Sequence, residues 1–168
     1  MAQVLLRARL EERGIAAHVH SAGTLAWGGR ATGNAEIAMH ERGLDLSRHH
    51  STALTRGLVR NADLVIGMTR EHVWRVTGLS SEAAERAFLV GELVRLGAMV
   101  GARDAEGGET VRAWALRVAR ARPDGPIGRY GDEVDDPVNE PLHVYRATAD
   151  RLDRDLTSVA DLLAPPPP

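Results

Sequence analysis

The sequence predicts an α/β fold, with helices packed on a parallel sheet. Short apolar runs alternate with amphipathic stretches of helical length, as units of strand, helix and strand require. Residues 63–68 are almost continuously apolar, which is typical of a strand covered on both faces. A length of 168 residues suggests one domain, predicted over residues 1–164, and the Pro165–Pro168 run is expected to be a disordered tail.

The elements follow from apolar spacing and from residues that start or stop helices. In the first helix Val4, Leu5 and Ala8 form one apolar stripe, and Gly14 is the expected stop. The chain opens inside this helix, without a capping residue before it. Helices are predicted over residues 2–13, 34–42, 56–62, 70–76, 82–87, 92–100, 110–122 and 142–163, and strands over residues 15–19, 63–68 and 87–90.

Several residues support these assignments. Ile37 and Met39 are predicted to point inward, and Thr55 and Thr69 are expected to cap the helices that follow them. The spacing of the last helix indicates packing on a sheet, with a coiled-coil partner as the alternative. Its apolar positions lie three and four apart: Leu142, Tyr145, Ala149, Leu152, Leu156, Val159 and Leu163.

The composition argues against several classes of function. The sequence has no cysteine, so a disulfide, a thiolate metal site and a cysteine nucleophile are excluded for this chain. The net charge of −2 gives no general attraction to nucleic acid. No apolar run approaches the roughly 20 residues of a membrane span, and no signal peptide is visible, so a cytoplasmic protein is expected. Walker and dinucleotide motifs are absent, and no cofactor is predicted.

The loop after the first predicted strand is the first candidate site. In an open α/β sheet, ligands bind where loops leave the carboxyl ends of strands. Ser21, Gly23 and Thr24 would supply hydroxyl groups and room for a ligand, and Trp27 would form a wall. The alternative for Trp27 is ordinary surface packing.

Two further groups carry polar chemistry. His18 and His20 lie two apart on the predicted strand, so both point to one face, a spacing that can bind zinc. No third residue follows at a spacing typical of a metal ligand, and no metal site is predicted.

Asp136 precedes a proline that would hold it rigid, so it can serve as a general acid. The alternative is that Asp135 and Asp136 are turn and cap residues.

Four motifs, in this order, resemble those of the low-molecular-weight protein tyrosine phosphatase family. Their order and approximate spacing match along nearly the whole chain. The motifs are His20-Ser21-Ala22-Gly23-Thr24 with Trp27, Gly43-Leu44-Asp45-Leu46-Ser47 with His49, the stretch from Asp63 to His72, and Asp136-Pro137 with Tyr145.

The resemblance implies a flavodoxin-like, doubly wound parallel sheet and hydrolysis of phosphotyrosine monoesters in a phosphoprotein or a small ester. In the family a Cys-x5-Arg loop follows the first strand and holds phosphate at a helix N-terminus. The cysteine attacks phosphorus and the arginine binds the phosphoryl oxygens. By match, Asp136 is the general acid and Trp27 the substrate wall, while Ser21 and His49 brace the phosphate loop.

The sequence departs from the family at its front end. It has neither a cysteine nor a Cys-x5-Arg loop, and Met1 aligns just past that loop. The first, central strand of the sheet is therefore expected to be missing as well. Val138 stands where the family usually has an aromatic residue, and His50 and Thr52 replace commonly basic positions.

Two hypotheses follow from this departure. In the first, the recorded start lies too far downstream, and the chain is inactive because its nucleophile is absent. In the second, the chain is a catalytically dead pseudophosphatase that acts as a binding or regulatory module. Arsenate reduction on the same fold is a third interpretation, but it also needs cysteines.

Overall fold

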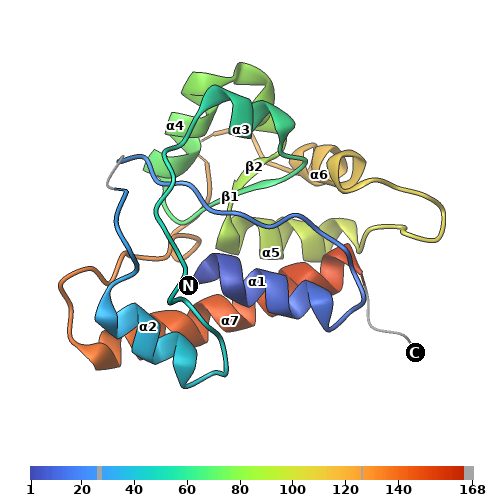
Figure 1. The fold of residues 1–168 in the computed structure, drawn as a ribbon. Helices are drawn as coiled ribbons and strands as arrows, with labels where there is room; N and C mark the ends of the chain where they lie inside the picture. The colour runs from blue at the N-terminus through green and yellow to red at the C-terminus, as the bar shows by residue number, and fades with distance from the viewer. Residues whose placement is uncertain (26–27, 126, 165–168) are drawn as a thin grey trace.

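The computed structural model describes residues 1–25, 28–125 and 127–164. Figure 1 shows a short sheet between two groups of helices, with α3 and α4 on one side and α1, α5 and α7 on the other. The elements are α1 Ala2–Glu11, α2 Gly33–His40, α3 Arg56–Asn61, β1 Val65–Gly67, α4 Arg70–Leu79, the 3₁₀ helix η1 Ser81–Glu85, β2 Ala87–Leu89, α5 Val90–Val100, α6 Val111–Ala119 and α7 Leu142–Leu163.

Strands β1 and β2 pair in parallel, and α4 and η1 form the connection between them. Successive side chains of a strand point to opposite faces of its sheet. Ala87 and Leu89 accordingly pack with Val73 and Val76 of α4, while Phe88 packs with Trp114 of α6 on the other face. Both faces of this sheet are covered by helices, which confirms the predicted α/β fold class.

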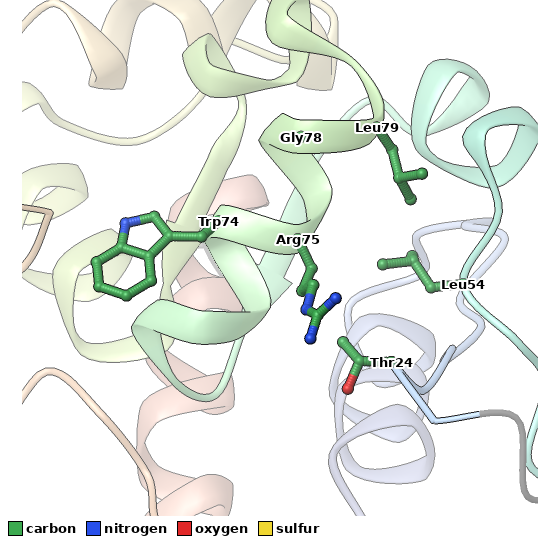
Figure 2. A pocket seen from close by; sticks show the side chains of 6 residues that line it. All are labelled: Thr24, Leu54, Trp74, Arg75, Gly78 and Leu79. Atoms are coloured by element: carbon green, nitrogen blue, oxygen red, sulfur yellow. The ribbon is translucent and has the colours of Figure 1, made fainter.

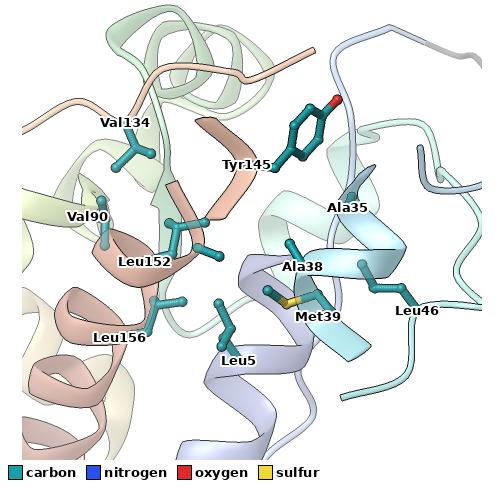
Figure 3. Close-up of a cluster of buried hydrophobic side chains, with 11 residues drawn as sticks. Leu5, Ala35, Ala38, Met39, Leu46, Val90, Val134, Tyr145, Leu152 and Leu156 are labelled. Carbon is teal, nitrogen blue, oxygen red and sulfur yellow. The ribbon is translucent and has the colours of Figure 1, made fainter. Parts of the chain in front are cut away.

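Helix α7 organises the layer below the sheet. It packs against α1, α2 and α5, and Figure 3 shows Leu152 and Leu156 of α7 beside Leu5 of α1, with Met39 of α2 close by. Its predicted apolar face is confirmed, because six of the seven positions are buried and Leu142 is half-buried. None of the described helices, α7 included, is long and apolar enough to cross a membrane.

Most predicted helix signals are confirmed. Thr55 accepts a hydrogen bond from the Leu58 amide at 3.3 Å, and Gly14 adopts a left-handed φ of 69° after α1. The inward orientation predicted for Ile37 is wrong, since 46% of this residue is exposed. Helix α2 buries Ala35 and Met39, and two residues of helix rotate a side chain by about 200°, which places Ile37 on the outer face.

The strand predicted over residues 15–19 is also wrong. The segment follows an extended course (Figure 1), and Ile15 and Val19 are half-buried, whereas Ala17, which a strict alternation would also place inward, is exposed. A strand also needs backbone hydrogen bonds to a neighbouring strand. Among the described residues, the one backbone bond of residues 15–22 joins the Ile15 amide to the Leu10 carbonyl of α1, so no strand pairs with this segment. Side chains of α1 bind this segment instead, since Gln3 and Arg7 both donate to the Val19 carbonyl, at 3.2 and 2.7 Å.

Candidate active site

Ser21 lies directly beyond this extended segment and is bound to α1. Its hydroxyl donates to the Gln3 side-chain oxygen at 2.8 Å, and the Gln3 amide nitrogen donates to the Val19 carbonyl. Ser21 therefore connects the candidate loop to the first turn of α1. That turn has no side-chain cap, and the open N–H groups of a helix N-terminus favour anions.

His49 lies near the same end of α1. It is half-buried, and its backbone amide donates to the Leu46 carbonyl at 2.9 Å. Burial lowers the pKa of His49, and the positive charges of the amino terminus and of His50 lower it further. The neutral imidazole is therefore the form that the folded protein favours.

We expect this imidazole to make the protein less stable in mild acid. The pKa of His49 is lowered from 6.5 in the folded state, so the unfolded chain takes up the proton first. The free energy of unfolding should fall as the pH decreases from about 7 to about 5. Urea unfolding of His49→Gln should show a smaller decrease than the wild type, and His143→Gln, at an exposed position, serves as the control. Identical pH profiles for the wild type and His49→Gln would contradict this assignment.

Asp136 is exposed and lies in the loop before α7. Its Oδ1 accepts a hydrogen bond from the Val138 amide at 3.0 Å, an arrangement typical of an Asx turn. The turn interpretation and the general-acid interpretation are therefore compatible, because the turn holds a carboxylate that solvent and substrate can reach. Pro137 is buried beside it, while 49% of Val138 is exposed.

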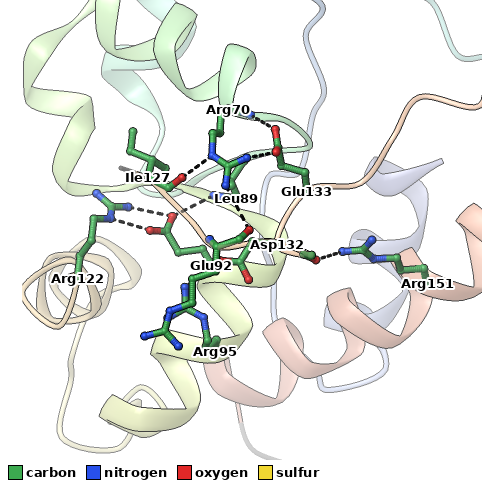
Figure 4. A network of polar contacts seen from close by, with 11 residues as sticks. Arg70, Leu89, Glu92, Arg95, Arg122, Ile127, Asp132, Glu133 and Arg151 are labelled. Atoms are coloured by element: carbon green, nitrogen blue, oxygen red, sulfur yellow. Dashed lines mark hydrogen bonds and ion pairs between the residues drawn. The ribbon is translucent and has the colours of Figure 1, made fainter. Parts of the chain in front are cut away.

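The loop that leads to Asp136 is attached to the start of α4 by Arg70. The Arg70 backbone amide donates to Glu133 Oε1 at 2.8 Å, and its guanidinium forms an ion pair with the same carboxylate. The guanidinium also donates to the carbonyls of Ile127, at 2.8 Å, and Arg129, at 3.3 Å (Figure 4). One arginine thus fixes the loop at three residues.

Asp132 fixes the same loop from within. Its side chain is nearly buried and accepts from Arg95 of α5 at 2.8 Å and from the Arg129 amide at 2.7 Å. Its carbonyl accepts from the Gly91 amide at 3.2 Å. Charge-assisted bonds of this kind are the stronger ones, so the loop before Asp136 is held to both α4 and α5.

Gly91 is the position where this loop approaches α5 most closely. A Cβ atom at Gly91 would lie 2.7 Å from the Asp132 Cα atom, which real Cβ contacts do not reach. We expect Gly91→Ala to push the loop outward and to lower the free energy of unfolding by about 1–3 kcal/mol, as overpacking does. Gly78→Ala is the matched control, since no atom lies within 4 Å of its added Cβ. Equal stabilities of the two variants would show that the loop moves freely.

A third ion pair lies beside β2. Glu92 of α5 is 1% exposed and accepts from Arg122 at 2.9 Å, and it also accepts from the Leu89 amide. The Arg122 guanidinium carbon lies 4.7 Å from the centre of the Phe88 ring. This pair joins the start of α5 to the segment after α6, and it contributes to the scaffold of the site rather than to its surface.

The structure brings the segments of the candidate site together around one buried cluster. Leu46, Val134 and Tyr145 belong to this cluster and Met1 packs against it, so the start of α1, the loop before His49 and the loop before Asp136 share one support. No hydrogen bond or ion pair links Ser21, His49 and Asp136 to one another within the described residues. Trp27 lies outside the described residues.

A cavity of about 340 Å³ lies beside the candidate loop (Figure 2). Thr24 and Leu54 form one side of it, and Arg75 of α4 points toward them. Trp74, Gly78 and Leu79 of α4 complete the lining, and no described residue of the Asp136 loop lines this cavity. Of the described residues in the candidate loop, only Thr24 lines this cavity. In the described parts of the chain, no group of three or more His, Asp or Glu side chains is placed to hold one metal ion.

Comparisons with known proteins identify a family of phosphatases. The family model described as low molecular weight phosphotyrosine protein phosphatase matches residues 1–99. A protein-arginine-phosphatase of Bacillus subtilis (strain 168) is 27% identical over 164 residues, which cover 97% of this chain and 87% of the relative. The probable low molecular weight protein-tyrosine-phosphatase AmsI of Erwinia amylovora is 34% identical over 91 residues, 54% of this chain and 60% of the relative.

Solved structures show the same fold. A YwlE mutant from Bacillus subtilis superposes with a TM-score of 0.69 and 25% identity, covering 95% of this chain and 86% of that one. The low molecular weight protein tyrosine phosphatase from T. tengcongensis superposes with a TM-score of 0.69 and 24% identity, covering 96% of this chain and 88% of that one.

Proposed function

We propose that this chain, which belongs to the low molecular weight phosphotyrosine protein phosphatase family, retains the general acid of that family's reaction but lacks its nucleophile. One observation carries the proposal: the sequence contains no cysteine. The resemblance assigns attack on phosphorus to a cysteine thiolate, which forms a phosphocysteine intermediate. We therefore propose that the 168-residue chain is inactive as a phosphatase, and that hydrolysis requires a Cys-x5-Arg loop in front of it.

Within that reaction we propose a general-acid role for Asp136. Its exposed carboxyl group would protonate the leaving oxygen of the substrate, and the contacts of Arg70 and Asp132 would keep the loop in place. Ser21 and His49 would brace the phosphate loop from the side of α1. The role of Trp27 as a wall for the substrate ring rests on the sequence match alone.

Two substrate classes fit the family. Phosphotyrosine in a protein, or a small phosphomonoester, follows from the sequence resemblance. Phosphoarginine is the second class, supported by the protein-arginine-phosphatase that matches 97% of this chain. Val138 in place of an aromatic residue leaves a smaller surface for a phenyl ring, and this also favours the second class.

A binding module is the second candidate function. The chain retains Asp136, Ser21 and His49 without a nucleophile, as a pseudophosphatase would. Isothermal titration calorimetry with one peptide in phosphotyrosine, phosphoarginine and unmodified forms distinguishes the two proposals. Selective binding of one phosphorylated form, without its hydrolysis, would support the binding module, and equal affinity for all three would exclude it. The single domain over residues 1–164 and the cytoplasmic location stay predictions.

A further inference from the structure

His18 and His20 are presented together on the solvent side of the extended segment that precedes Ser21. In an extended chain, residues two apart point to the same face. Val19 between them points inward and packs with the buried cluster of α5, α6 and α7, while both histidines are exposed. Neither imidazole donates or accepts a hydrogen bond within the described residues, so its nitrogens are available to a ligand.

The backbone under this histidine pair is held in place. The Val19 carbonyl accepts from Gln3 and Arg7 of α1, and Ser21 donates to Gln3 one residue beyond the pair. These three contacts hold the segment at the Val19 carbonyl and at Ser21. A ligand that bridges the two rings would then cost less conformational entropy than on a free chain.

The distance between the rings suits a shared metal ion. Their centroids lie 6.1 Å apart, and the ring planes meet at 83°. An imidazole nitrogen binds Zn²⁺ at about 2.0–2.1 Å, which puts each centroid about 3.2 Å from the ion. Two such rings lie about 5.2 Å apart in tetrahedral geometry and about 6.4 Å apart when they oppose each other. The observed separation lies between the two values and nearer that of opposed rings, so a tetrahedral ion would draw the rings about 0.9 Å closer together.

We propose that His18 and His20 bind one divalent transition-metal ion, of the class Zn²⁺, Ni²⁺ or Cu²⁺, with water in the remaining positions. Imidazole nitrogen is a preferred ligand of these ions. No third protein ligand lies beside the pair among the residues that the structure describes. The ion would therefore exchange with solvent, unlike the ion of a closed structural zinc site. The Arg7 guanidinium, which donates to the adjacent Val19 carbonyl, is positively charged. It repels a metal ion at this site and lowers the affinity of the site for the ion. This proposal is independent of the phosphatase chemistry.

The test is calorimetric titration of the 168-residue protein with ZnCl₂ at neutral pH. One ion per chain is expected for the wild type, and His18→Gln and His20→Gln should each weaken binding at least about tenfold, a change of 1.4 kcal/mol in binding free energy. His50→Gln, which also removes an exposed imidazole, should bind as the wild type does.

A second measurement locates the ion. Substoichiometric NiCl₂ should broaden the NMR signals of the two imidazoles of His18 and His20 before those of any other histidine. Binding that survives the double change of His18 and His20 to glutamine would overturn the proposal. Broadening that begins at His49 or His50, or a wild type without saturable zinc binding, would overturn it equally.

Discussion

The 168-residue chain is expected to hydrolyse neither p-nitrophenyl phosphate nor phosphotyrosine peptides above the rate in buffer. Phosphatase turnover needs a nucleophile and donors that stabilise the equatorial phosphoryl oxygens, and the sequence has no cysteine to supply the nucleophile. A general acid such as Asp136 contributes only about 10²–10⁴-fold on its own. Enzymes accelerate reactions by about 10⁶-fold or more, and phosphate monoesters are among the slowest to react without catalysis.

The control is the same chain preceded by a strand and a Cys-x5-Arg loop of the family type. This extended protein should turn over both substrates, and a cysteine-to-serine change in the added loop should abolish the turnover. Both versions are assayed side by side after circular dichroism has shown that each is folded. Robust turnover by the unextended chain, retained through purification to homogeneity, would contradict the role assigned to the missing nucleophile.

The helices of this fold could be predicted from sequence because their signals are local. Apolar positions three and four apart fix the buried face of α7, and Thr55 and Gly14 mark helix ends through bonds that span a few residues. Strand β1 was predictable for a related reason, since an apolar run covered on both faces needs no polar alternation. The strand prediction for residues 15–19 failed because an apolar pattern is local whereas a strand needs a partner. No strand of the described chain pairs with this segment.

The ion pairs that hold the loop of the candidate site in place could not be predicted from the sequence. Arg70 and Glu133 are 63 residues apart in the chain, and Arg95 and Asp132 are 37 apart. Residues this far apart leave no repeating pattern in the sequence, because their contacts depend on how the loop crosses the ends of α4 and α5. Asp136 was identifiable through its proline and its family match, whereas the residues that hold its loop became visible only in three dimensions. An ion-pair partner is a property of the packed fold.

In the extended protein, Asp136→Asn is expected to slow phosphotyrosine hydrolysis by about 10²–10⁴-fold. Asparagine keeps the Oδ1 acceptor that binds the Val138 amide, so the turn is preserved while the acidic proton is lost. Cleavage of p-nitrophenyl phosphate should slow much less, because p-nitrophenolate leaves readily without protonation. Asp135→Asn, at the exposed neighbouring position, is the matched control and should leave both rates near those of the parent. Steady-state kinetics with both substrates measures the contrast, and an equal loss on the two substrates would remove Asp136 from the general-acid role.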